Sequence, residues 1–186
     1  NPKDQNGIKL FLPFHGMKPL PADDVDLTQT LLKQNFGAVK KISLAGKKTN
    51  CRQKALQLFS KFSLIPENSW IDSPDTLKAL ILVVDPAFGA LREIAAQVFQ
   101  EAGVGKVIEV NAGKNGAVNL RSGVADLEGC PRITAEMISK PTGIFHSHKA
   151  IVKLFEIGRA NKKSAESGKK RIAGAIFDAD GDRFFC

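Results

Sequence analysis

Tyrosine is absent from this chain of 186 residues, and tryptophan occurs only once. Proteins that bind single-stranded nucleic acid pair a basic surface with aromatic side chains on which bases stack. The chain is basic, with a formal net charge of +8, but its lysines occur as scattered pairs such as Lys40-Lys41 and Lys169-Lys170. The pattern is most consistent with a solvated lysine surface. The second interpretation is that these lysines attract a phosphorylated small substrate. We therefore expect no nucleic-acid partner.

Cysteine and long apolar runs are also scarce. Cys51, Cys130 and Cys186 are odd in number and far apart, which argues against a disulfide framework or a zinc site. No apolar run approaches the about 20 residues that a membrane-spanning helix needs, so we expect no membrane partner. The opening residues 1–4 are neither a signal peptide nor a natural start, so we expect a preceding segment. Thiols that form no disulfide framework are typical of a reducing compartment, so we expect a cytoplasmic location.

Two histidines stand one residue apart, at His146 and His148. Histidine is a common metal ligand, so this pair could seed a metal site. No further ligand lies nearby in the sequence, and such pairs more often belong to a loop or to the start of a helix. We favour that second interpretation.

Apolar patterns predict an α/β fold, with mixed or parallel sheets flanked by helices. Short apolar runs predict strands, and apolar residues at helical spacing predict helices. The strand, helix and strand between residues 79 and 110 form a βαβ unit, whose strands should be parallel. The prolines at 66 and 74 indicate a connection, so we predict one domain over 1–64, a linker over 65–78 and a second domain over 79–186. The predicted strands are 8–12, 79–84, 106–110 and 171–177, and the predicted helices lie near 23–36, 55–62, 91–102 and 147–160. Asp23 or Asp24 could cap the first of these helices.

The most informative stretch comes after the last of these strands, where Asp178, Asp180 and Asp182 alternate with small residues and precede Arg183. In an extended or looped backbone, side chains two residues apart project the same way, so the three carboxylates can converge on one ion. Carboxylate oxygens suit Mg²⁺, Mn²⁺ or Ca²⁺, and we expect Mg²⁺ together with an oxyanion. A loop at the carboxyl end of a buried strand is also where open α/β sheets bind ligands.

Other interpretations of this stretch are weaker. An EF-hand calcium loop has glycine at its sixth position and glutamate at its twelfth, whereas here Arg183 is sixth and the chain stops at the ninth. An acidic surface turn beside an exposed arginine is the plainest alternative. The position of the loop after an apolar strand makes that alternative less favourable.

The segment from Gly174 to Arg183 resembles the metal-binding loop of the α-D-phosphohexomutases, the phosphoglucomutase and phosphomannomutase family, which reads Asp-Gly-Asp-x-Asp-Arg. The segment Asn1–Lys9 is similar to the stretch just after the phosphorylated serine of that family, where Ser-His-Asn-Pro leads to Asn-Gly-x-Lys. Val83-Val84-Asp85 through Gly89 resembles the first strand and glycine turn of the second domain. Ala179 stands where the family loop usually has glycine.

The resemblance implies that the chain holds the end of the first domain and most of the second domain of a four-domain enzyme. The family moves phosphate between the 1 and 6 positions of a hexose phosphate through a phosphoserine and a bisphosphate. By resemblance, Asp178, Asp180 and Asp182 bind Mg²⁺, and Arg183 and Lys9 act at the reacting phosphoryl group. The serine should precede Asn1 by two residues, so the chain alone is expected to be inactive.

Two alternatives stay open. The stretch from Ile176 to Gly181 also resembles the haloacid-dehalogenase phosphatases, in which Asp178 would be the nucleophile. That family usually has Thr or Val where this chain has Asp182. The chain could instead act only as a metal-binding or interaction module.

Overall fold

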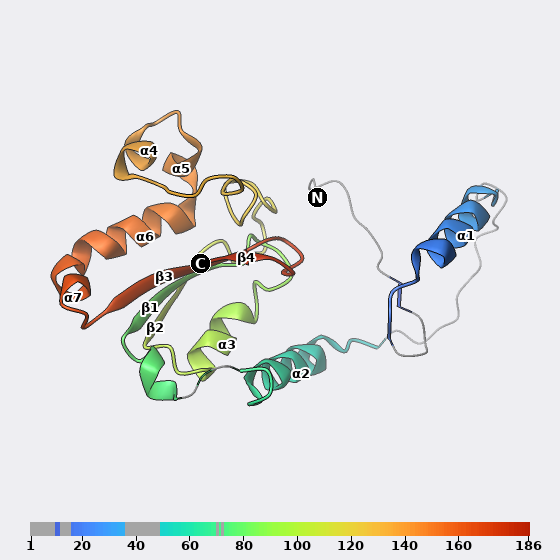
Figure 1. The fold of residues 1–186 in the computed structure, drawn as a ribbon, viewed down its shortest axis with the longest axis horizontal. Helices are drawn as coiled ribbons and strands as arrows, with labels where there is room; N and C mark the ends of the chain where they lie inside the picture. The colour runs from blue at the N-terminus through green and yellow to red at the C-terminus, as the bar shows by residue number, and fades with distance from the viewer. Residues whose placement is uncertain (1–9, 12–15, 36–48, 70, 72) are drawn as a thin grey trace. The chain divides into compact units, whose positions relative to one another are not determined.

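The structure, a computed structural model, describes residues 10–11, 16–35, 49–69, 71 and 73–186 (Figure 1). The described residues from Cys51 onward form one compact unit, and those before Cys51 belong to a second unit. The predicted strand 8–12 lies mostly outside the described residues. The predicted division at 65–78 stays a prediction.

The second unit contains helix α1, Pro21–Leu32. The sequence predicted that Asp23 or Asp24 would cap it, which is wrong, because the residue at the cap position is Leu20. Both aspartates lie in the first turn, where their charges favourably oppose the positive end of the helix dipole. Pro21 begins the helix because its fixed φ suits the first turn and its missing N–H needs no partner there.

The larger unit is built on a four-stranded sheet with the order β2-β1-β3-β4. The central strand β1 pairs in parallel with β2 on one side and with β3 on the other, and β4 pairs with β3 in the antiparallel direction. The sheet is therefore mixed, and the predicted α/β class is confirmed. The strands are β1 (Leu80–Asp85), β2 (Lys106–Glu109), β3 (Arg171–Phe177) and β4 (Phe184–Phe185).

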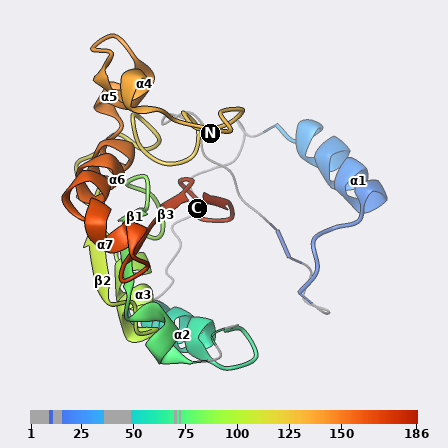
Figure 2. The same cartoon turned by 60° about the vertical axis from the view of Figure 1, so that its left-hand side comes forward.

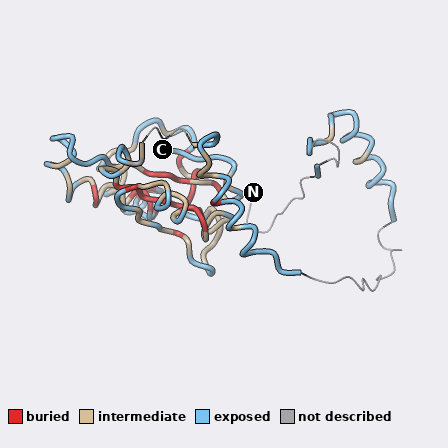
Figure 3. Tube along the Cα trace, turned by 90° about the horizontal axis from the view of Figure 1, so that it is seen from below, coloured by how far each residue is buried: buried red, intermediate tan, exposed pale blue. Residues whose placement is uncertain are grey.

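Helices cover both faces of this sheet (Figures 1 and 2). Successive residues of a strand point to opposite faces, so Ile81 and Val83 pack into one cluster and Leu82 and Val84 into another. The first cluster includes Ile151 of α6 (Lys149–Ala160), and the second includes Ala95 of α3 (Ala95–Glu101). Figure 3 shows the buried residues gathered along the strands between these layers.

The remaining elements connect these layers, and one sequence prediction needs correction. The predicted helix 91–102 begins only at Ala95, because residues 91–94 form a turn in which the Ile94 amide donates to the Leu91 carbonyl. Leu91 and Ile94 still pack inward, so apolar spacing alone could not distinguish turn from helix. The other elements are α2 (Arg52–Leu64), a 3₁₀ turn η2 (Pro74–Leu77), α4 (Ala135–Ser139), α5 (Ile144–Ser147) and α7 (Lys162–Glu166).

The topology defines one edge of the sheet as the place for a site. From β1 the chain passes to β2 on one side, and then crosses to β3 on the other side. In open α/β sheets, ligands bind beyond the carboxyl ends of the strands at this kind of reversal. Here that place is flanked by Asp85 at the end of β1 and by Asp178 just after β3.

None of the helices in the described part of the chain has the length and apolar character that crossing a membrane requires.

One polar contact joins α2 to α3 and predicts a pH-dependent effect. The Ser60 hydroxyl donates to Glu101, as does the Gln97 amide, and these bonds lower the pKa of Glu101 below its ordinary value of 4.5. A carboxyl whose pKa is lower in the folded state stabilises the protein at pH values above 4.5, its ordinary pKa. This stabilisation is lost as the pH falls through the folded-state pKa. We expect Ser60→Ala to lower the urea midpoint at neutral pH and to lower it less in acid.

Ser63→Ala in the same helix is the matched control, because the Ser63 hydroxyl donates only to the Phe59 carbonyl. Its effect should not change with pH. Equal effects of the Ser60 variant at neutral and acid pH would contradict the assignment.

Candidate metal site

The candidate site is the loop Asp178–Arg183, called here the acidic loop, which joins β3 to β4. The pairing of Phe177 with Phe184 brings the two ends of the loop together. The Asp178 amide donates to the Arg183 carbonyl at 3.1 Å and so closes the loop. The short antiparallel strand therefore fixes the loop at the carboxyl edge of the sheet.

Asp178 organises the interior of the acidic loop. Its Oδ1 accepts hydrogen bonds from the amides of Gly181 and Arg183, at 3.0 and 3.2 Å. Its Oδ2 accepts a hydrogen bond from Nε of Arg183 at 3.0 Å. Asp178 is only 5% exposed, so the loop backbone is folded around its carboxylate.

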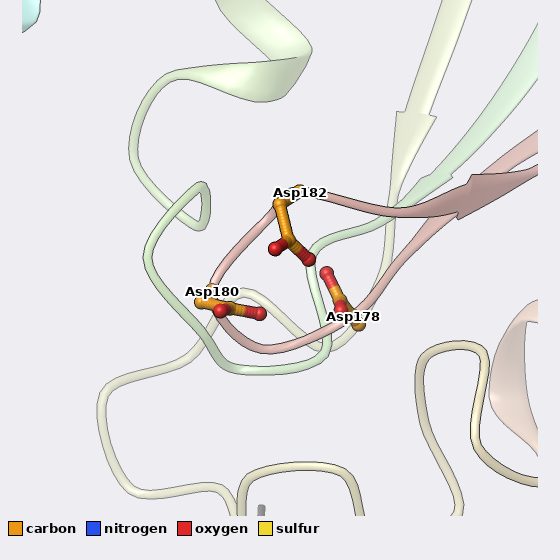
Figure 4. A group of neighbouring side chains, drawn as sticks. All are labelled: Asp178, Asp180 and Asp182. Atoms are coloured by element: carbon orange, nitrogen blue, oxygen red, sulfur yellow. The ribbon is translucent and has the colours of Figure 1, made fainter. Parts of the chain in front are cut away.

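The three aspartates come together as their spacing predicted (Figure 4). One carboxylate oxygen from each of Asp178, Asp180 and Asp182 lies within 4.8 Å of the others. Asp180 and Asp182 are exposed, whereas Asp178 is buried, so the cluster opens to solvent on one side. Among the residues that the structure describes, this is the group of acidic, histidine or cysteine side chains whose geometry suits a metal ion.

The surroundings of Asp178 favour its charged form. Burial raises the pKa of its carboxyl, but hydrogen bonds from the side chain and backbone of Arg183 and from the Gly181 amide, together with the contact to the Asp182 carboxyl, outweigh burial. The net pKa is below the ordinary value of 3.8. Asp178 is therefore a carboxylate at neutral pH, as a metal ligand must be.

Arg183 bridges two carboxylates. Its Nε donates to Asp178, and its Nη1 donates to Oε1 of Glu128 at 2.6 Å. These contacts hold the guanidinium beside the carboxylate cluster, with 61% of its side chain still exposed. An exposed cation in a fixed orientation next to a metal site is suited to a phosphate oxyanion.

The turn after β1 lies directly against the acidic loop. The Ala90 amide donates to the Ala179 carbonyl at 2.7 Å. Gly89 is so close that an added Cβ would lie 2.6 Å from Cα of Ala179. A cavity of about 400 Å³ borders the same contact and is lined by Ala179, Arg92 and Arg52, among others. The glycine turn that the sequence singled out therefore supports the backbone of the acidic loop.

The other residues that the sequence singled out are Lys9, His146 and His148. Lys9 is outside the described residues. His146 is exposed and contacts the Ile138 carbonyl, and the buried His148 donates from Nε2 to the Gly123 carbonyl at 2.9 Å. His148 is the residue just before α6, in agreement with the helix-start interpretation.

Sequence reasoning missed Glu128 as a contact of the site. It lies 55 residues before Arg183, in the segment 111–149, where the sequence analysis considered His146 and His148 but not Glu128. No local pattern could have indicated this contact, because it is made only when the segment folds over the edge of the sheet.

Comparison with known proteins gives one informative match. The chain is 33% identical over 129 residues to a phosphoglucosamine mutase from Actinobacillus succinogenes. The matched region is 69% of this chain and 27% of that relative, so the chain spans about a quarter of the relative's length. No family model matches the sequence. No solved structure matches it significantly either.

Three observations agree with one another: the family-like motifs in their order along the chain, the α/β architecture and this match. Phosphoglucosamine mutase is a member of the phosphohexomutase family, and the fold is consistent with a domain of such an enzyme. The predicted resemblance of this chain to the α-D-phosphohexomutase family is thereby confirmed over part of its length.

Proposed function

We propose that this chain is part of a phosphohexomutase that moves phosphate between the 1 and 6 positions of a hexose, through a phosphoserine and a bisphosphate. The observation that carries the proposal is the convergence of Asp178, Asp180 and Asp182 beside Arg183, at the carboxyl ends of the parallel strands β1 and β3. The similarity to a phosphoglucosamine mutase supports the same family of reactions.

In this proposal, residues 1–64 are the end of the first domain, 65–78 are a linker and 79–186 are the second domain. The serine and the sugar-recognition loops belong to other parts of the enzyme, so the chain alone should not turn over a hexose phosphate. The partner of the whole enzyme is a hexose phosphate, with no nucleic-acid or membrane partner, and the location is the cytoplasm.

The three aspartates fit Mg²⁺ in chemistry and spacing. Mg²⁺ prefers oxygen ligands at about 2.0–2.1 Å in an octahedral arrangement, so neighbouring ligands around it are about 3 Å apart and opposite ones about 4.2 Å. The three carboxylate oxygens lie within 4.8 Å of one another, so the side chains would close in on an ion that they share. When bound, Mg²⁺ would offset the charge of a transferring phosphoryl group.

The chain's own residues would then share the remaining work. Arg183, held by Asp178 and Glu128, would present a guanidinium to phosphoryl oxygens. The buried carboxylate of Asp178 would hold the loop backbone in shape through the amides of Gly181 and Arg183. Lys9, by resemblance, would stabilise charge or move a proton at the reacting oxygens.

Two observations bear on the alternative of a haloacid-dehalogenase phosphatase. Asp182 stands where that family usually has Thr or Val, and the chain is similar to a phosphoglucosamine mutase. The mutase is therefore the better supported of the two proposals.

Calorimetric titration with Mg²⁺ tests the site. We expect the chain to bind Mg²⁺ weakly and Asp180→Asn to bind it at least about tenfold more weakly, since losing even an outer partner of a metal site commonly costs 10–100-fold. Asp180 is exposed, so this substitution should leave the fold intact.

Asp75→Asn is the charge-matched control. Asp75 is exposed in η2, which precedes β1 and so lies at the other end of that strand from the site. The Asp75→Asn variant should bind Mg²⁺ with the same affinity as the unmodified chain. Equal affinities of the unmodified chain and Asp180→Asn would exclude the acidic loop as the metal site.

A further inference from the structure

Asp85 is a fully buried carboxylate at the end of the central strand β1. Its Oδ1 accepts a hydrogen bond from the Ala87 amide at 2.8 Å. Its Oδ2 accepts two, from the side-chain amide of Asn111 and from the backbone amide of Gly123, both at 3.0 Å. All three partners are donors, which matches a carboxylate, the side chain that only accepts.

These bonds join three segments that are distant in sequence. Ala87 begins the turn after β1, Asn111 follows β2, and Gly123 belongs to the long segment before α4. Further backbone bonds connect the same segments, because the Phe88 amide donates to the Asn111 carbonyl at 2.8 Å and the Asn119 amide donates to the Ala87 carbonyl at 3.3 Å. Asp85 is the side chain at the centre of this network.

Two of the segments contact the strand and loop that carry the candidate site. The turn after β1 holds the Ala179 carbonyl through the Ala90 amide. Gly123, with a φ of +68°, is so close to β3 that an added Cβ would lie 2.6 Å from the Phe177 carbonyl oxygen, next to Asp178. The network around Asp85 therefore supports the acidic loop at its start and at Ala179.

The Gly123 peptide is held from both sides. Its amide donates to Asp85, and its carbonyl accepts from Nε2 of His148, which is also fully buried. Because the amide and the carbonyl of Gly123 are both hydrogen-bonded, the backbone of this residue is held in place against Phe177. Removing the acceptor at Asp85 would leave the Gly123 amide buried without a partner.

We propose that Asp85 is a positioning residue for the acidic loop: by fixing the turn after β1 and the Gly123 peptide, it holds the backbone around Asp178 in the geometry that gathers the three carboxylates. The proposal rests on the proposed function of that loop as a metal site. The hydrogen bonds of Asp85 go to Ala87, Asn111 and Gly123, so Asp85 acts through the segments that it joins.

Amide hydrogen exchange of the metal-free protein is the primary test, because it reports on the loop independently of metal binding. In Asp85→Asn, one oxygen is replaced by a donor that faces donors. We expect faster exchange at the amides of Gly181 and Arg183, whose hydrogen bonds Asp178 accepts, and at the amide of Ala90, which donates to Ala179. Amides in the middle of α6 should keep their protection.

Two further variants keep the test decisive if Asp85→Asn folds poorly. Asn111→Gly removes only one of the three bonds at Asp85, and glycine readily takes the positive φ of 55° at this position, so a smaller but similarly localised effect is expected. Ile157→Ala removes a buried side chain in the last turns of α6 and serves as a control for general loss of stability. It should leave the loop amides protected.

Localised loss of protection in the Asp85 and Asn111 variants supports the proposal. Unchanged loop protection, or a general loss matched by Ile157→Ala, overturns it. Titration with Mg²⁺ then separates the two proposals: if the unmodified chain binds Mg²⁺, Asp85→Asn should bind it about tenfold more weakly. Failure of the unmodified chain to bind Mg²⁺ would overturn the metal-site function, while the exchange result would still decide the role of Asp85.

Discussion

Replacing Gly89 with alanine is expected to destabilise the protein by about 1–3 kcal/mol, the usual cost of forcing an extra methyl group into a packed site. The new Cβ would overlap the carbonyl oxygen of Ala179 and lie 2.6 and 2.7 Å from its Cα and carbonyl carbon. These are backbone atoms, so no side-chain rotation relieves the overlap. The turn after β1 and the acidic loop must separate, and the bond from Ala90 to Ala179 should weaken.

Urea unfolding and calorimetric Mg²⁺ titration check this expectation together. We expect a lower urea midpoint and weaker Mg²⁺ binding, because the displaced backbone belongs to the loop that carries the carboxylates. Gly158→Ala is the control, since Gly158 lies within α6 with no atom near the position of an added Cβ. Alanine there should stabilise the helix by about 0.5–1 kcal/mol and leave Mg²⁺ binding unchanged. Wild-type stability and binding in Gly89→Ala would show that the close approach is not rigid.

Much of the central sheet could be predicted because β1 and most of β3 are covered on both faces and therefore read as continuous apolar runs. The predicted strand 171–177 agrees with β3, and the runs at 79–84 and 106–110 agree with β1 and β2 to within a residue at each end. The strand β4 was missed, because a two-residue strand has no periodicity and depends on its partner β3.

The convergence of Asp178, Asp180 and Asp182 could also be predicted, since it depends on spacing in a looped backbone. The surroundings of these three side chains could not be predicted. Glu128 reaches Arg183 across 55 residues, and Asp85 reaches Gly123 across 38. Contacts over such separations depend on how the segment 111–149 folds over the edge of the sheet, which local patterns do not encode.

The two arginine contacts of the site differ in energetic weight. The pair of Arg183 with Glu128 is exposed, and exposed ion pairs contribute about 0–1 kcal/mol. The bond from Arg183 to Asp178 ends on a buried carboxylate, so losing it leaves polar groups unpaired inside the loop. Asp178 therefore matters for folding as well as for any metal, whereas Glu128 chiefly orients the guanidinium.

The second large effect is expected for Asp178→Asn, which should abolish Mg²⁺ binding and destabilise the protein by about 1–3 kcal/mol, the cost of leaving buried donors unsatisfied. The asparagine amide must replace either Oδ1, which faces the amides of Gly181 and Arg183, or Oδ2, which faces Nε of Arg183. In both orientations a donor faces a donor. The acidic loop should therefore loosen even in the absence of metal.

Asp182→Asn separates the two roles, because it removes the same charge from an exposed position of the same cluster. Surface substitutions of this kind usually change stability by no more than about 0.5 kcal/mol, and removing one of three neighbouring negative charges relieves repulsion. Urea unfolding and Mg²⁺ calorimetry on both variants should show lost binding in each, but lost stability only in Asp178→Asn. Retained binding in Asp178→Asn would remove the buried carboxylate from the metal site, and equal destabilisation by both substitutions would show that burial does not set the difference between them.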